Sequence, residues 1–209
     1  MIEVKLLSIT PDAEALIEEC GRTAYLSFSK KTENSKEKFI KMIIRSGHLS
    51  VLEHASATFR IKGGSRSFTH QLVRHRLAAF TQQSQRYVSE NNFSYVIPDA
   101  IKNNHGIRVM YEEHMENVRR FYETLLNNGV KKEDARFVLP NAVESEIVMT
   151  ANFREWRHIL EIRGDLHAQW EIRKIAIEIL KILKEKAPSC FFDMYVDGNQ
   201  IKSDQSGKR

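Results

Sequence analysis

The sequence predicts a single α+β domain over residues 1–197, with a mixed or antiparallel sheet and long helices. Residues 54–62 alternate between apolar and polar side chains, which is the pattern of a half-buried strand. Residues 106–128 and 167–186 instead carry apolar side chains at helical spacing. An apolar fraction of 42% and a charged fraction of 28% are ordinary for a globular protein and argue against disorder.

The first half of the chain is expected to mix strands with short helices. Pro11 suits the first position of a helix, and Gly21 and Gly47 are expected to end helices. Ser65 is expected to cap a helix that leads into a basic cluster, and residues 77–87 look polar and irregular. The expected elements are a strand over 1–10, a helix over 11–21, a helix over 35–46, a strand over 54–62 and a short helix after residue 65.

The second half is expected to be mainly helical. Asn152 and Asp165 are suitable N-caps for two helices, and Pro188 should end the second of them. The polar residues 198–209 are expected to form a disordered tail. The expected elements are a strand over 95–97, helices over 106–128 and 132–137, a strand over 145–150, helices after residue 152 and over 167–186, and a strand over 190–196.

Charge and cysteine content limit the possible functions. A net charge of +5 suggests anionic ligands, but does not separate a nucleotide from a nucleic acid. Cys20 and Cys190 have no metal-binding spacing, so we expect no disulfide framework and no metal site. No apolar run approaches the roughly 20 residues of a membrane span, and Glu3 and Lys5 interrupt the N-terminus, so a cytoplasmic enzyme is expected.

The cluster Arg74-His75-Arg76, followed by Ser84 and Arg86, is the first candidate site. Guanidinium groups bind phosphate and carboxylate oxygens through paired hydrogen bonds. The cluster alone could equally be a solvated basic helix end, stabilised by the helix dipole. The long polar segment that follows it favours a binding loop.

Two further arginines are candidates. Arg163 and His167 would be neighbours on one face if a helix continued through Gly164, although a break at that glycine would leave Arg163 at the end of an element. Arg136 lies among apolar residues, where an unpaired charge is costly. Its partner could be an internal carboxylate or a ligand phosphate, and the sequence does not separate these alternatives.

Four blocks, taken together and in order, resemble the flavin-dependent thymidylate synthases. The resemblance extends from about residue 20 to residue 195. The central block is the arginine-histidine-arginine cluster with its serine, and the other blocks surround His54, Arg136 and Arg163. In this sequence the blocks read LEHASATFRI, RHRLAAFTQQSQRY, ARFVLP and NFREWRHILEIRGDLHAQWEIR.

The resemblance implies reductive methylation of dUMP to dTMP, with FAD as cofactor, NADPH as reductant and methylenetetrahydrofolate as carbon donor. It also implies a homotetramer with active sites shared between subunits, with no nucleic-acid or membrane partner. Arg163 is expected to be catalytic, because a fixed guanidinium beside uracil would stabilise the negative charge that builds on the ring. The implied FAD residues are Ser56, Arg74, His75, Arg76, Gln82, Asn152, Phe153, Arg154 and His158, with His54 nearby. The implied dUMP residues are Gln71, Arg74, Gln82, Gln83, Ser84, Gln85, Arg86, Arg136 and Arg163.

Two other functions remain as alternatives. A nucleic-acid-binding module could use the basic segment from Arg74 to Arg86, and its binding would depend strongly on salt. An FAD reductase without dUMP activity would leave Arg86, Arg136 and Arg163 without a nucleotide partner. Titration with dUMP separates the reductase from the synthase.

Overall fold

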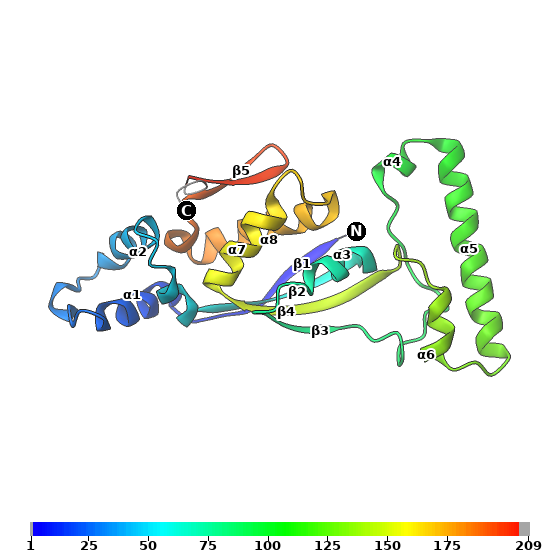
Figure 1. Ribbon diagram of the computed structural model, residues 1–209, viewed down its shortest axis with the longest axis horizontal. Coiled ribbons are helices and arrows are strands. Elements are labelled where there is room, and N and C mark those ends of the chain that lie inside the picture. Colours follow the sequence, from blue (N-terminus) through cyan, green and yellow to red (C-terminus); the bar gives the residue numbers. More distant parts are fainter. Residues whose placement is uncertain (1, 205–209) are drawn as a thin grey trace. The chain divides into compact units, whose positions relative to one another are not determined.

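The computed structural model describes residues 2–204, which divide into two compact units (Figure 1). Unit 1 comprises residues 2–3, Ile61–Gln71 and Thr81–Ile147, and unit 2 comprises Val4–Arg60, Leu72–Phe80 and residues 148–204. A four-stranded sheet has the order β1-β2-β4-β3, and a separate hairpin pairs β5 with β6. Helices and sheets together give the expected α+β class. The strands are β1 (Glu3–Ile9), β2 (Ser56–Ser65), β3 (Ala79–Gln82), β4 (Glu144–Asn152), β5 (Met194–Asp197) and β6 (Gln200–Ser203).

Burial along β4, and along β2 as far as Gly63, follows the period of two that a sheet with one covered face requires. The apolar residues Ala57, Phe59 and Ile61 are buried, while Ser56 and Thr58 between them are half-buried. On β4 the same alternation buries Ile147 and Met149. The alternation in residues 54–62 therefore predicted both the strand and its buried face.

In unit 2, the helices α7 (Phe153–Gly164) and α8 (Trp170–Lys186) pack against each other. The indole of Trp156 on α7 donates a hydrogen bond to the carbonyl of Ala57 on β2 (3.0 Å) and meets the ring of Phe59 edge to face (5.1 Å between centroids). A buried ion pair between Arg157 and Asp193 (2.7 Å) ties α7 to the residues before β5. The helices of unit 2 are α1 (Ala13–Thr23), η1 (Phe28–Lys30), α2 (Ser35–Arg45), η2 (Leu49–His54), α7 (Phe153–Gly164), α8 (Trp170–Lys186) and η4 (Pro188–Phe191).

Unit 1 is built around the long helix α5, drawn in green in Figure 1. Met115 on α5 packs in a small core with Phe93 and Val143, and this core also holds the isolated bridge between Tyr95 and Val143. The helix α3 begins in unit 1, where the Ser65 hydroxyl accepts from the amide of Phe68 (3.1 Å), as the sequence predicted. These helices are α3 (Arg66–Leu72), α4 (Asp99–Lys102), α5 (His105–Asn127), α6 (Lys132–Ala135) and η3 (Arg136–Val138).

Several expected boundaries were wrong. Gly21 does not end a helix, because α1 continues to Thr23 and Gly21 lies against the ring of Phe39. Part of the segment predicted to be irregular forms the short strand β3. Within the expected strand over 190–196, residues 190–191 belong to the 3-10 helix η4, and β5 begins only at Met194.

The C-terminal segment also differs from the expected disordered tail. Gln200–Ser203 forms β6 and pairs antiparallel with β5, from Met194 opposite Ser203 to Asp197 opposite Gln200. The turn contains Gly198, whose positive φ of 61° suits glycine. Residues 205–209 of the expected tail lie outside the described residues. Among residues 2–204, none of the helices combines the length and the apolar character needed to cross a bilayer.

Candidate functional site

The arginine-histidine-arginine cluster forms a turn directly after α3, which ends at Leu72. The amide of His75 donates to the carbonyl of Leu72 (3.2 Å), and the amide of Ala78 donates to the carbonyl of His75 (3.1 Å). Arg74 and Arg76 are exposed, whereas His75 is only 7% exposed. The turn therefore presents two arginines to solvent and directs the histidine inward.

His75 is held by residues of α7. The Nε of Arg163 donates to the Nε2 of His75 at 2.9 Å, and a carboxylate oxygen of Glu155 lies 3.5 Å from its Nδ1. The ring of His158 meets the ring of His75 edge to face, with 6.1 Å between centroids. Burial, together with the charges of Arg163 and His158, lowers the pKa of His75 from 6.5 to about 4. His75 is therefore neutral at physiological pH.

Arg163 lies in the last turn of α7 and is half-buried. Burial lowers the pKa of Arg163, and the nearby charge of Arg74 lowers it further. Two guanidinium groups of the same sign thus lie close enough to interact, which creates a positive field attractive to an anion. Of the two alternatives for Arg163, the break at Gly164 is confirmed, because α7 ends at that residue and Arg163 lies in its last turn. The exposed His167 ring contacts Asp165 (2.7 Å) rather than Arg163.

A cavity of about 740 Å³ lies beside this cluster in unit 2. Its wall combines an apolar side chain, Leu77, with three of the residues expected to bind FAD: Asn152, Arg154 and His158. Both the volume and the mixture of apolar and hydrogen-bonding groups are typical of a cofactor pocket. The remaining lining residues are Gly47, Leu49, Glu53, Glu155, Arg157 and Glu161.

The beginning of α7 positions the residues of this cavity. The side chain of Asn152 accepts from the amide of Glu155 (2.8 Å), so Asn152 is the N-cap that the sequence predicted. Arg154 pairs with Glu53 at 2.5 Å, and both side chains are largely exposed. An exposed pair of this kind contributes at most about 1 kcal/mol, so the guanidinium can exchange its carboxylate for a ligand anion.

Three other residues near the expected flavin site have different surroundings. Phe153 is fully buried and packs on Phe191 (5.4 Å between centroids), so its side chain belongs to the core. Ser56 is half-buried on β2, and its amide donates to the hydroxyl of Thr10 (2.9 Å). His54 is exposed at the end of η2.

In unit 1, Gln82 and Gln83 point to different partners. The amide of Gln82 donates to the hydroxyls of Thr69 (3.0 Å) and Ser145 (3.1 Å). The amide of Gln83 donates to the carboxylate of Glu90 (3.1 Å). Burial raises the pKa of Glu90, while this hydrogen bond opposes the increase.

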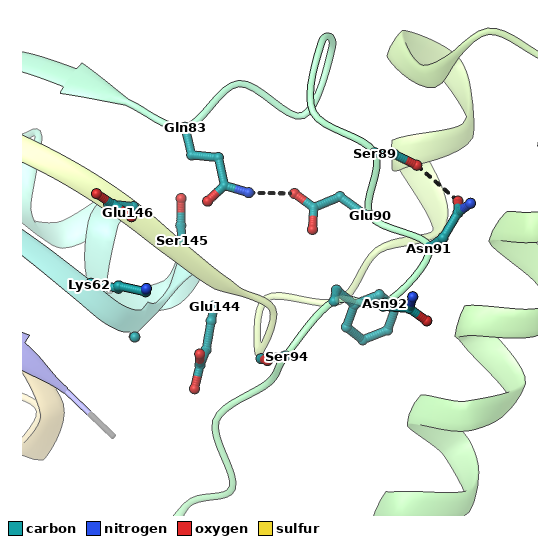
Figure 2. Close-up of a pocket in the computed structure, with 12 residues that line it drawn as sticks. Lys62, Gln83, Ser89, Glu90, Asn91, Asn92, Ser94, Glu144, Ser145 and Glu146 are labelled. Carbon is teal, nitrogen blue, oxygen red and sulfur yellow. Dashed lines mark hydrogen bonds between the residues drawn. The ribbon is translucent and has the colours of Figure 1, made fainter.

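Figure 2 shows Gln83 and Glu90, joined by this hydrogen bond, among the residues that line a pocket of about 400 Å³. The acidic side chains Glu144 and Glu146 also line it, with the ammonium of Lys62 among them (Figure 2). Of the expected dUMP residues, Gln83 is the one that lines this pocket. Three glutamates and one lysine give the wall a net negative charge, which disfavours a phosphate group.

Glu133 connects two of the candidate arginines of unit 1. Its carboxylate accepts from the Nε (3.2 Å) and Nη2 (3.1 Å) of Arg86, and its carbonyl accepts from the Nε of Arg136 (3.0 Å). The hydroxyl of Ser84 accepts from the amide of Arg86 (3.3 Å). Arg136 is half-buried between the fully buried Ala135 and Phe137, which is 83% exposed, so the apolar sequence around it is only partly buried.

The candidates thus form two groups, one in each unit. Arg74, Arg163 and His75 gather in unit 2, where the cavity-lining residues also lie. The sequence interpretation did not include Glu155, although its position three residues before His158 places both side chains on one face of α7. The expected dUMP residues in unit 1 are Gln71, Gln82, Gln83, Ser84, Gln85, Arg86 and Arg136.

Comparison with known proteins identifies the family. The family described as "Thymidylate synthase complementing protein" matches residues 5–189. The flavin-dependent thymidylate synthase of Geobacter sulfurreducens is 42% identical over 92% of this chain and 86% of that protein. The proteins of the same name from Corynebacterium diphtheriae (41% identical, 92% and 83%) and Pyrococcus furiosus (43% identical, 82% and 72%) are similar. The chain therefore belongs to the family of flavin-dependent thymidylate synthases.

Proposed function

We propose that this chain methylates dUMP to dTMP, with FAD as cofactor, NADPH as reductant and methylenetetrahydrofolate as carbon donor. The names of its relatives support the flavin and the thymidylate product. The observation that carries the proposal is the hydrogen bond between Arg163 and His75 (2.9 Å), with the charge of Arg74 close by. This hydrogen bond fixes the guanidinium of Arg163 in a half-buried position, close to the positive charge of Arg74.

Arg163 is the catalytic residue of this proposal. Uracil must become nucleophilic at C5 to accept a one-carbon unit, and negative charge then builds on its ring. A guanidinium held before the reaction begins stabilises that charge without further rearrangement. The neutral ring of His75 accepts a hydrogen bond from Arg163 and does not neutralise the positive charge of the guanidinium.

The phosphate and sugar of dUMP are assigned to the remaining arginines and their polar neighbours. Arg86 pairs with Glu133 through largely exposed side chains, so a phosphate can displace this carboxylate at low cost. Arg136 lies beside the same glutamate. Burial lowers the pKa of Arg66 and the charge of Arg136 lowers it further, which indicates a second positive charge nearby. The proposed dUMP residues are Gln71, Arg74, Gln82, Gln83, Ser84, Gln85, Arg86, Arg136 and Arg163.

FAD is assigned to the cavity beside α7. When bound, it supplies the hydride of the reductive step. Asn152, Arg154 and His158 offer an amide, a guanidinium and an imidazole to its polar groups, and Leu77 offers an apolar wall. Ser56, Arg74, His75, Arg76 and Gln82 complete the proposed set, and Phe153 contributes by anchoring the start of α7 in the core rather than by side-chain contact.

Residues 1–197 are proposed to act as one functional domain, and four chains to assemble with shared active sites. The family match supports the first part, because residues 5–189 include segments of both units. Light scattering should give four chains of 24.3 kDa each. A monomer that makes dTMP would contradict shared sites.

An anaerobic assay with omissions tests the proposed reaction. Purified protein should be yellow, dUMP should change the flavin absorbance, and dTMP should form only when the protein carries FAD and both NADPH and methylenetetrahydrofolate are supplied. Oxidation of NADPH without dTMP would instead indicate a flavin reductase. Salt-sensitive binding of single or double strands by a colourless protein would indicate the nucleic-acid-binding alternative.

A further inference from the structure

Glu155 is a buried carboxylate that lines the cavity assigned to FAD but is not among the proposed substrate or flavin residues. It is 6% exposed, and burial raises its pKa. A buried carboxylate is costly unless a polar partner compensates it. The Nδ1 of His75 lies 3.5 Å from a carboxylate oxygen of Glu155, and the nearby charge of His158 partly opposes the increase in the pKa of Glu155.

The hydrogen bond from Arg163 determines which nitrogen of His75 carries the proton. The Nε of an arginine always carries hydrogen and can only donate, so the Nε2 of His75 must accept. A neutral imidazole has a single N–H, which must then be on Nδ1. That N–H faces Glu155, so the three side chains form a directional series from a carboxylate through an imidazole to a guanidinium.

Both ends of this series are on the same rigid element. Glu155 and Arg163 lie about two turns apart on α7, and His75 reaches them from the turn after α3. Among residues 2–204, the charged and titratable groups in contact with the His75 ring are Glu155, His158 and Arg163. Nothing in this set except Glu155 can accept the Nδ1 proton, because Arg163 can only donate and His158 meets His75 ring edge to ring face.

We propose that Glu155 is a positioning residue, which holds His75 in the orientation and tautomer that present Nε2 to Arg163 and thereby fixes the catalytic guanidinium. This inference rests on the proposed function, since it assumes that Arg163 acts on the uracil ring. Without the carboxylate, the His75 ring can rotate or move its proton to Nε2, and either change breaks the bond to Arg163. A misplaced guanidinium then stabilises the transition state less well.

The alternative role for Glu155 is purely structural, as part of the start of α7. The cap at this position uses the backbone amide of Glu155, which donates to Asn152, and substitution of the side chain leaves that amide in place. Glu155→Gln keeps an oxygen that can accept from Nδ1, whereas Glu155→Ala removes it. The two variants therefore separate the positioning role from a role in folding.

The test compares wild type, Glu155→Gln and Glu155→Ala as holoenzymes. Glu155→Ala should lower kcat for dTMP formation by about 10- to 100-fold. Because His75 is also a proposed FAD residue, kcat is measured per bound flavin, and Glu155→Gln should restore it to within about threefold of wild type. Glu178→Ala is the control, because this carboxylate of α8 pairs with Lys181 (2.7 Å) and should leave all values unchanged.

Three results would overturn the proposal. The first is an unchanged kcat in Glu155→Ala, and the second is an equal loss of kcat in both variants with flavin retained. The third is loss of flavin or of folded protein in Glu155→Gln, which would show a structural role. Absence of dTMP in the wild-type reaction is a different outcome, which would reject the proposed function itself.

Discussion

Acid should destabilise the protein through His75. The pKa of this histidine is about 4 in the folded protein, against 6.5 for an ordinary histidine. At pH values between about 4 and 6.5, His75 is protonated in the unfolded chain but not in the folded protein. The stabilisation is therefore complete above pH 6.5 and is lost as the pH falls from about 6.5 to about 4.

The size of this effect follows from the pKa difference. One pKa unit corresponds to about 1.4 kcal/mol, so the difference contributes about 3 kcal/mol to the free energy of unfolding, of which about 2 kcal/mol is lost between pH 7 and pH 5. Glu155 acts in the opposite direction, since its raised pKa favours the folded state at low pH. Burial is the main cause of that increase, so a substitution of His75 leaves most of it in place.

Urea unfolding at pH 7 and pH 5 measures the effect in wild type and in His75→Asn, at fixed protein and flavin concentrations. Wild type should lose about 2 kcal/mol more than His75→Asn on acidification. The control is His114→Asn, an exposed position on α5, which should follow wild type. Equal losses in wild type and His75→Asn would refute the buried, neutral state of His75.

Three further substitutions probe the elements that support the site. Asn152→Ala should lower the stability by about 1 kcal/mol in urea unfolding through loss of the α7 cap, and should also lower the flavin content, whereas Asn152→Asp should keep the stability. Trp156→Phe should cost about 1–3 kcal/mol because it leaves a buried carbonyl without its donor, and an unchanged unfolding midpoint would contradict that contact. Gly164→Ala would place its Cβ 2.6 Å from Ile201 and should cost about 1–3 kcal/mol, which Ile201→Ala should relieve; a neutral Gly164→Ala would contradict the packing of β6 on α7.

The sequence predicted elements whose local signals are strong. The alternation around Phe59 gave a strand and its buried face, and Asn152 marked the start of α7. It did less well where the decisive contact is distant. Glycine commonly ends helices, but Gly21 lies inside α1, where it packs against the ring of Phe39. β6 is polar in sequence and is ordered by its pairing with β5.

In the candidate site too, local sequence signals were informative, whereas contacts between distant residues could not be predicted. The basic character of Arg74 and Arg76 is local, and both are exposed as a binding cluster requires. His75 is buried and accepts a hydrogen bond from Arg163, which is 88 residues away in the chain, so no local sequence pattern indicates this contact. Glu155 has the position of a helix-capping glutamate, and only the folded structure shows its side chain turned toward His75.

The most direct test of the central claim is to measure flavin content and dTMP formation together in Arg163→Ala. We expect this variant to remain yellow, to retain the wild-type amount of FAD and to make no detectable dTMP. Synthesis of dTMP at the wild-type rate by the flavin-loaded variant would show that the guanidinium held by His75 is not the group that acts on the uracil ring.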